Sequence, residues 1–150
     1  MFLPCKAIAT VFLLICSIDA VAGGGYGSGS SCANPIEIFG VCSYQTDANI
    51  RSKDECEYCP GGSTWYKFPG DGKEYMFEVY DSSNPKYVDV GISIMSGSSC
   101  GALACEAVID KYHHGGSEVH TMTLSLGTDY YINPFYIGGA ADELVLIITP

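Results

Sequence analysis

The chain has 150 residues with 17 acidic and 7 basic side chains, which gives a formal net charge of −10 at neutral pH. Surfaces that bind DNA or RNA are basic, so this composition excludes nucleic acid as a partner. The length suits one domain, and the high cysteine content indicates an oxidising compartment.

Residues 1–22 have the composition of a secretory signal peptide. Lys6 supplies the positive charge, residues 7–18 form an apolar run, and the Ala-Val-Ala sequence at 20–22 is the small-residue pattern that precedes cleavage. The run is shorter than the ~20 apolar residues that cross a bilayer, and no later stretch approaches that length. We therefore expect a secreted, extracellular product without a membrane span, beginning near Gly23.

Residues 23–31 read GGGYGSGSS and have the composition of a flexible segment. Such a segment is not expected to pack, and it would leave Tyr26 exposed. Two interpretations stay open: an inert spacer, or a tail that docks on, or is cross-linked to, a neighbouring molecule. The folded domain would then occupy residues 32–150.

From residue 32 onward the sequence predicts strands separated by Gly, Pro, Asn and Ser, with no convincing helix. Its best-defined part is an antiparallel meander of three strands at residues 64–68, 74–80 and 87–95, joined by turn-forming residues. The other predicted strands are residues 36–41, 104–109, 118–126, 129–137 and 143–149. Eight short strands favour two facing sheets, so we expect an all-β, eight-stranded jelly-roll-like β-sandwich.

Three features of these strands predict burial. Along residues 87–95 apolar side chains alternate with Asp89, Gly91 and Ser93, so one face should be buried and the other exposed. The last strand is apolar on both faces, which is typical of a central strand or of one covered by a partner. Trp65, at the start of the meander, is predicted to lie in the core.

Six cysteines remain after the leader, and an even number in an exported chain predicts three disulfides. They are Cys32, Cys42, Cys56, Cys59, Cys100 and Cys105. We expect Cys100 and Cys105 to bond to each other, because they close a short loop after a strand and would fix its register. Cys56 and Cys59 should each reach back to Cys32 or Cys42, in an order that stays open. A zinc or redox role for the close pair is disfavoured, because no second pair has matching spacing.

Catalytic and cofactor-binding patterns are missing from the sequence. No Ser/His/Asp or Cys/His arrangement stands out, so we predict a protein that is not an enzyme, with no cofactor and no metal site. Calcium stays open through oxygen ligands in the acidic connection, although no EF-hand-like spacing is present and a solvated face is the better interpretation. The acidic residues concerned are Asp47, Asp54, Glu55 and Glu57.

Eleven tyrosines are present, and the predicted strand at residues 129–137 contains several. Alternation along a strand requires at least one of Tyr130 and Tyr131 to face outward, where it can stack on a sugar or anchor a protein interface. The candidate interface residues are Tyr26, Tyr130, Tyr131 and Tyr136. His120, which alternates with Met122, is predicted at the edge of the core.

An ordered set of short motifs resembles the bacterial pre-peptidase C-terminal (PPC) domain. The motifs are CANPI at 32–36, TWYKF at 64–68, SGSSCGALAC at 96–105 and LGTDYYI at 126–132. The resemblance covers most of residues 32–150 and implies an all-β, jelly-roll-like module without catalytic residues, usually appended to secreted proteases and other exported proteins. The chain departs from the family pattern at 109–114, where members often carry an acidic turn. We expect the module to stand alone rather than beside a protease.

These features favour a secreted, non-catalytic extracellular structural or adhesive protein. It would self-associate, or bind matrix or cell-surface proteins, through its β-sandwich; the alternative is a carbohydrate-binding module that uses exposed tyrosines to hold glycans. Residues 119–150 contain no Lys or Arg to protect an unpaired strand edge, which supports self-association. The flexible residues 23–31 would let segment 32–41 of one copy pair with the edge of another.

Overall fold

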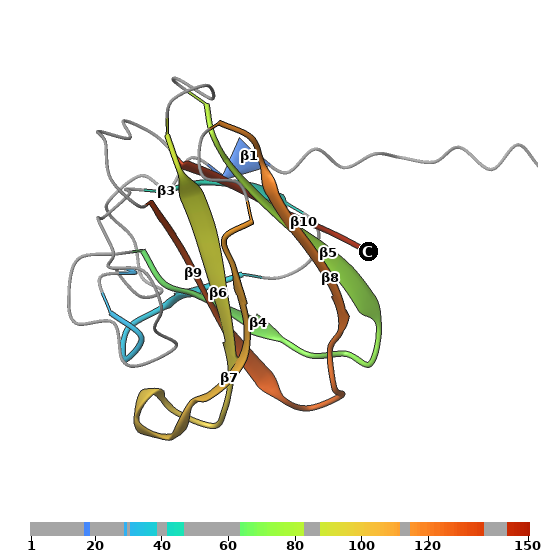
Figure 1. Ribbon diagram of the computed structural model, residues 1–150. Helices are drawn as coiled ribbons and strands as arrows, with labels where there is room; N and C mark the ends of the chain where they lie inside the picture. Colours follow the sequence, from blue (N-terminus) through green and yellow to red (C-terminus); the bar gives the residue numbers. More distant parts are fainter. Residues whose placement is uncertain are drawn as a thin grey trace, which may run out of the picture.

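Alternating side chains and closely spaced turns make strands of most of the chain that the structure describes (Figure 1). The computed structural model describes residues 17–18, 29, 31–38, 42–46, 64–82, 88–111, 115–136 and 144–150, without the side chains of 17–18, 42–46 and 136. The strands are β1 (Ser17–Ile18), β2 (Ile36–Glu37), β3 (Cys42–Thr46), β4 (Tyr66–Pro69), β5 (Glu74–Asp81), β6 (Val90–Ser96), β7 (Ala104–Ile109), β8 (Glu118–Thr123), β9 (Asp129–Tyr136) and β10 (Leu144–Thr149). A single 3-10 turn, η1 (Cys100–Ala102), lies between β6 and β7. Within these ranges, no helix is long and apolar enough to cross a membrane.

The strands form two five-stranded sheets. Sheet A has the order β1-β3-β10-β5-β8, and sheet B has the order β2-β4-β9-β6-β7. Neighbouring strands are antiparallel except β1 with β3 and β2 with β4, which are parallel. Four antiparallel pairs are β3–β10, β4–β9, β5–β8 and β6–β7. Along the chain each pair encloses the next, with β6–β7 innermost, and successive pairs alternate between sheet A and sheet B. This arrangement confirms the all-β expectation of two facing sheets.

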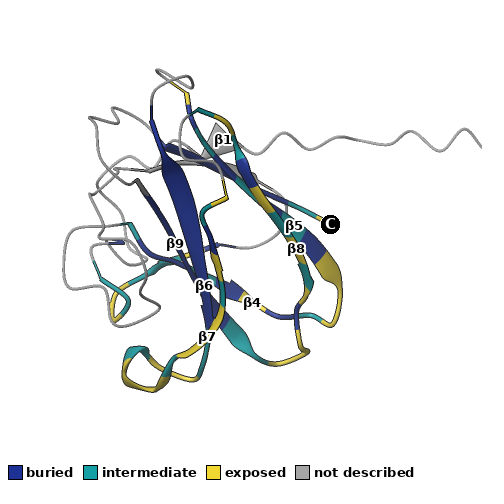
Figure 2. Cartoon of the chain, viewed as in Figure 1, coloured by how far each residue is buried: buried dark blue, intermediate teal, exposed yellow. Residues whose placement is uncertain are grey.

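The main core lies between the two sheets (Figure 2). Its positions alternate along each strand, because the period of two directs one side of every strand inward. Its members include Tyr66 and Phe68 of β4, Tyr75, Phe77 and Val79 of β5, Val90, Ile92 and Ile94 of β6, Tyr130 and Ile132 of β9, and Leu144, Leu146 and Ile148 of β10. β10 lies between β3 and β5, so of the two interpretations of the apolar last strand the structure shows the central position.

All eight predicted strands are present, but β1 and β3 were not predicted, so the sandwich has ten strands rather than eight among the described residues. The predicted meander is wrong. β4 and β6 belong to sheet B and β5 to sheet A, so none of the three pairs with another. The turn after β4 is held to the turn before β9: Gly70 N donates to Thr128 O (2.7 Å) and Gly127 N donates to Gly70 O (2.9 Å). Gly70 permits this close approach, because a Cβ there would lie 2.2 Å from the carbonyl oxygen of Ser125. The chain is thereby directed across to the other sheet.

β6 is buried on both faces, although its alternation predicts one exposed face. Asp89, Gly91 and Ser93 are all buried, together with the apolar residues between them. Gly91 lies under the ring of Phe135 on β9, where a Cβ would come within 2.4 Å of Cζ. Small and polar residues on a strand therefore do not by themselves indicate a solvent-exposed face. Here they leave room for other groups to pack on the outer face of sheet B.

Gly29, before β2, packs on sheet B, contrary to the expectation of a flexible region ending at residue 31. Gly29 is buried with φ +67°, its N–H donates to Asn34 O (2.9 Å), and its carbonyl oxygen accepts from Trp65 N (2.8 Å). Ile36 and Glu37 then pair with β4 as β2. The folded domain thus includes Gly29, and the β2 segment pairs within its own chain rather than with a neighbour.

Candidate interaction surface

A second apolar cluster covers the outer face of sheet B. Trp65, Met95 and Tyr131 are 2%, 3% and 5% exposed, and Cys32 and Leu103 pack against them. The sheet register places Met95 directly opposite Tyr131, while Trp65 immediately precedes β4. Trp65 is therefore buried, as predicted, but in this outer cluster rather than between the sheets.

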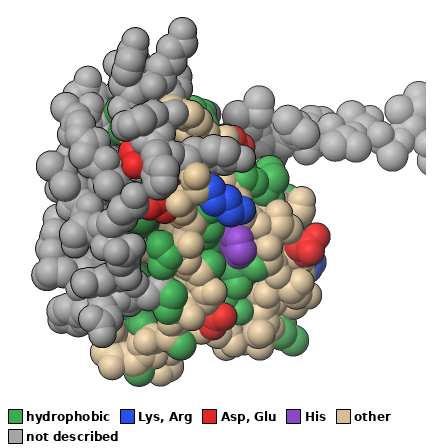
Figure 3. Space-filling model, viewed as in Figure 1, with side chains coloured by type: hydrophobic (Ala, Val, Ile, Leu, Met, Phe, Trp, Pro, Cys, Tyr) green, Lys and Arg blue, Asp and Glu red, His purple; other side chains and the backbone are tan. Residues whose placement is uncertain are grey.

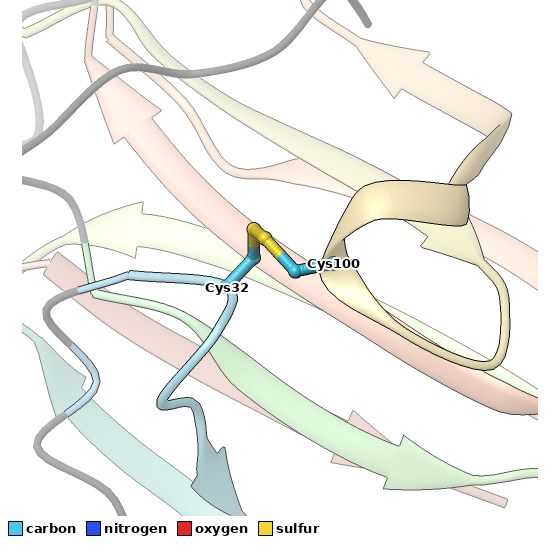
Figure 4. Close-up of a disulfide and its surroundings, with 2 residues drawn as sticks. All are labelled: Cys32 and Cys100. Atoms are coloured by element: carbon cyan, nitrogen blue, oxygen red, sulfur yellow. A yellow bond between two sulfur atoms is a disulfide. The ribbon is translucent and has the colours of Figure 1, made fainter.

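A disulfide joins the N-terminal segment to the turn after β6 (Figure 4). Cys32 bonds to Cys100 with their Cα atoms 5.3 Å apart, a normal spacing for a disulfide. The predicted bond between Cys100 and Cys105 is wrong, and Cys105, on β7 opposite Met95, takes part in a different disulfide. The pairing of β2 with β4 explains the error, because it carries Cys32 alongside sheet B to the end of β6.

The same bond removes Cys32 from the partners predicted for Cys56 and Cys59. Those two cysteines and the side chain of Cys42 lie outside the described residues. Among the described residues, Cys32–Cys100 is the one disulfide for which both partners are present. The other two of the three expected disulfides stay predictions.

The two neighbouring tyrosines of β9 are buried, so the expectation of an exposed tyrosine at this position is wrong. Tyr130 is 3% exposed, points into the main core, and accepts a hydrogen bond on its hydroxyl from Ser125 N (2.9 Å). Tyr131 points to the other side of the sheet, as alternation requires, but lies in the Trp65 cluster. Tyr26 and the side chain of Tyr136 are outside the description.

An ion-pair network ties three strands together near this cluster. The Nζ of Lys67 on β4 lies 2.9 Å from Asp129 Oδ2 on β9 and 3.7 Å from Glu37 Oε1 on β2. The hydrogen bond to Asp129 is the main cause that raises the pKa of Lys67 above its usual value. The network links β2 to β4 and β9, and the raised pKa favours the charged form of Lys67.

The free edges of the two sheets differ in how they are protected. β2 is two residues long, too short to offer a template to another strand. β1 is equally short, but it lies within the predicted signal peptide, so in a processed chain β3 would form that edge of sheet A. β7 has a bulge: Ile94 lies opposite Ala107 and Met95 opposite Cys105, so Glu106 is an extra residue on the edge strand. Glu106 also hydrogen-bonds the hydroxyl of Ser96. A bulge with a carboxylate is a common protection of a strand edge.

Within the part of the chain that the structure describes, β8 lacks such protection, and we take it as the candidate interaction surface. It pairs with β5 from Glu118 to Thr123 without a bulge, and contains no Lys, Arg or Pro. Val119, Thr121 and Thr123 are exposed (Figure 2), whereas the carboxylate of Glu118 is buried and accepts a bond from Lys111 N (2.8 Å). β7 and β8 contact each other, so the two edges share one side of the sandwich.

His120 lies on the inward side of β8, opposite Phe77, and is half-buried. Figure 3 shows a histidine side chain beside a basic side chain on one face of the molecule. Burial is the larger cause that lowers the pKa of His120 below its usual value, and the charge of Lys111 is the second cause. The predicted position at the edge of the core is confirmed.

The free energy of unfolding should therefore decrease as the pH falls below 6.5. The unfolded chain binds a proton on this histidine at a higher pH than the folded chain, so acid favours unfolding until the pH lies below the folded pKa, where the effect is complete. Urea titrations between about pH 8 and pH 5 would measure this decrease, and His120→Gln should lose this part of it. If the free energies of unfolding of wild type and His120→Gln differed by the same amount at every pH, His120 would not be the cause of the decrease.

The described residues contain no group of three or more His, Cys, Asp or Glu side chains placed to hold a metal ion. The acidic residues considered for calcium, Asp47, Asp54, Glu55 and Glu57, lie outside them. Calcium binding by the acidic connection therefore stays an open alternative from the sequence.

No family model matches the chain, and the curated proteins contain no significant match. The resemblance to the PPC domain, which depends on short motifs, therefore stays a prediction. The sequence showed that residues 119–150 lack Lys and Arg, which is one property of the candidate surface. It did not show that β8 lies at the edge of a sheet.

Proposed function

We propose that this is a secreted, non-catalytic extracellular protein with a structural or adhesive role, and that it self-associates through its β-sandwich. The observation that carries the proposal is the edge of β8, a regular six-residue strand whose outward side chains are uncharged. Proteins that remain monomeric usually protect such an edge with Lys, Pro or a bulge, as β7 does. The signal-peptide composition of residues 1–22 supports an extracellular location.

The proposal includes a jelly-roll connectivity for the sandwich. The nested pairs from β3–β10 to β6–β7 support it, because a jelly roll consists of eight antiparallel strands in two interlocked Greek keys. Such a body also agrees with the resemblance to the PPC domain, which implies a module that binds or supports rather than catalyses. Matrix or cell-surface proteins are the other partners that this role would involve.

The carbohydrate-binding alternative has less support. It needs aromatic rings exposed for stacking on sugars, and both Tyr130 and Tyr131 are buried. Among the described residues, the exposed large apolar side chains are instead aliphatic: Val108, Val119 and Leu126. Aliphatic side chains beside a free strand edge fit a protein partner better than a glycan.

We expect the purified protein to sediment as dimers or larger species at micromolar concentration. The association should strengthen with added salt, because each copy has a net charge of −10 and salt screens the repulsion between copies. Sedimentation velocity over a range of concentrations and salt would measure both effects. A protein that remains strictly monomeric would contradict the proposal, and a monomer that binds glycans would favour the alternative.

A further inference from the structure

The geometry points to a second copy of this chain as the partner at the β8 edge, paired β8 to β8 and antiparallel about a two-fold axis at Thr121. This inference rests on the proposed self-association and specifies the surface and the register that produce it. A two-fold interface uses the same residues on both copies, so a single strand edge must be complementary to itself.

The hydrogen bonds around Leu124 show which residues of β8 direct their backbone to the free edge. Leu124 N donates to Lys73 O (2.9 Å), and Leu124 O accepts from Gly72 N (2.9 Å), so the backbone of Leu124 faces the β5 side. The register from Glu74↔Thr123 to Val79↔Glu118 continues this pairing without interruption. Since these directions alternate along an antiparallel strand, the N–H and C=O groups of the odd-numbered residues point away from β5.

Among the described residues no strand pairs with this side of β8. The backbone groups that point away from β5 belong to Val119, Thr121 and Thr123, which are also the residues with exposed side chains. Residues that face each other across an antiparallel pair must present hydrogen-bonding groups to each other and place their side chains on the same face. Pairing Thr121 with Thr121, and Val119 with Thr123, satisfies both conditions and uses every outward residue of the strand. That register would form about six backbone hydrogen bonds and join the two A sheets into one.

Side chains and charges agree with this register. Val and Thr are β-branched residues that form favourable cross-strand pairs. The nearest outward carboxylates are on β5, where Glu74 lies opposite Thr123 and Glu78 lies opposite Val119. Glu74 of one copy would be three strand spacings, or roughly 14 Å, from Glu78 of the other, beyond the screening length of about 8 Å at physiological salt. Two acidic molecules can therefore meet at this edge.

Thr121→Pro tests the backbone pairing. The N–H of Thr121 points away from β5, so proline removes a donor of the dimer while leaving the β5–β8 ladder intact, and the melting temperature should change little. We expect the dissociation constant for self-association to rise at least ~10-fold. The matched control is Thr121→Val, which keeps the N–H and the β-branched shape and should associate as the wild type does.

A charge exchange tests the two-fold register. Thr121→Lys and Thr121→Glu, each alone, should weaken association, because like charges then face each other across the axis. An equimolar mixture of the two variants should restore the dimer, since opposite charges meet there. Only a register that pairs residue 121 with itself predicts this rescue.

Sedimentation velocity on the wild type, the single variants and the mixture distinguishes the outcomes. Wild-type association that persists in Thr121→Pro, or variants whose mixture gains nothing over each alone, would overturn the β8 pairing while leaving self-association intact. A monomeric wild type would overturn both. Loss in Thr121→Pro and Thr121→Lys, retention in Thr121→Val, and rescue in the mixture would support the inference.

Discussion

Trp65→Ala should lower the free energy of unfolding by about 3 to 5 kcal/mol, the largest effect that we expect from one side chain here. The indole is 2% exposed and packs with Met95 and Tyr131. Removing it takes away its burial and leaves a cavity under Cys32 and Leu103, which contact the same cluster. The loss should loosen the N-terminal segment as well, because Cys32 packs against this cluster and Gly29 O accepts a hydrogen bond from Trp65 N.

Urea denaturation of wild type and variant, followed by circular dichroism, would measure the loss. Trp65→Phe retains a ring and should cost much less. Leu126→Ala is a matched control for surface truncation, since Leu126 is 80% exposed and its removal should change stability by no more than about 0.5 kcal/mol. If Trp65→Ala unfolded at the same urea concentration as the wild type, the outer cluster would contribute nothing to stability and its burial would need another explanation.

Replacing both Cys32 and Cys100 with serine should cost about 4 kcal/mol. The two residues are separated by 68 positions, and a bond that closes so long a loop removes much of the freedom of the unfolded chain. The double variant avoids leaving one unpaired thiol that would exchange with other disulfides. The free energy of unfolding under non-reducing conditions is the measurement.

Mass spectrometry of a non-reduced digest provides an independent check of the pairing. A peptide pair containing Cys32 and Cys100 is expected. Detection of Cys100 linked to Cys105 would instead restore the short loop that the sequence suggested, and the double variant would then have removed half of two different bonds. A second control is Ser99→Ala beside Cys100, an exposed position that should leave stability unchanged.

The strands were predictable from the sequence because each depends on its own alternation and on flanking Gly, Pro and Asn. The strand β3 was missed, since its sequence CSYQT is mostly polar and lacks the apolar alternation that identifies a strand. The partners of the strands were not predictable. Residues 69–72 can reverse the chain, but only the bonds of Gly70 and Gly127 to distant parts direct β5 into the other sheet.

The candidate surface was predictable only in part, for a similar reason. The absence of Lys and Arg indicates that a strand would be unprotected at an edge. Whether the strand lies at an edge depends on the order of all the strands in the sheet. The bulge at Glu106 likewise appears only when β7 is matched against β6. Burial of Tyr131 and the bond of Cys32 to Cys100 depend on a layer outside sheet B, which alternation along single strands does not reveal.

The order of strands also determines when this domain can fold. β9 (Asp129–Tyr136) lies between β4 and β6, and β10 (Leu144–Thr149) lies between β3 and β5, so the middle of each sheet is made last during synthesis. Before these residues leave the ribosome, β3 and β5 have no strand to connect them, nor do β4 and β6. A nascent chain, or one shortened before residue 144, would expose apolar strands with unpaired edges, the condition in which chains aggregate or bind chaperones. Long-range pairing of this kind is slow, so folding should occur as one late event after synthesis rather than strand by strand.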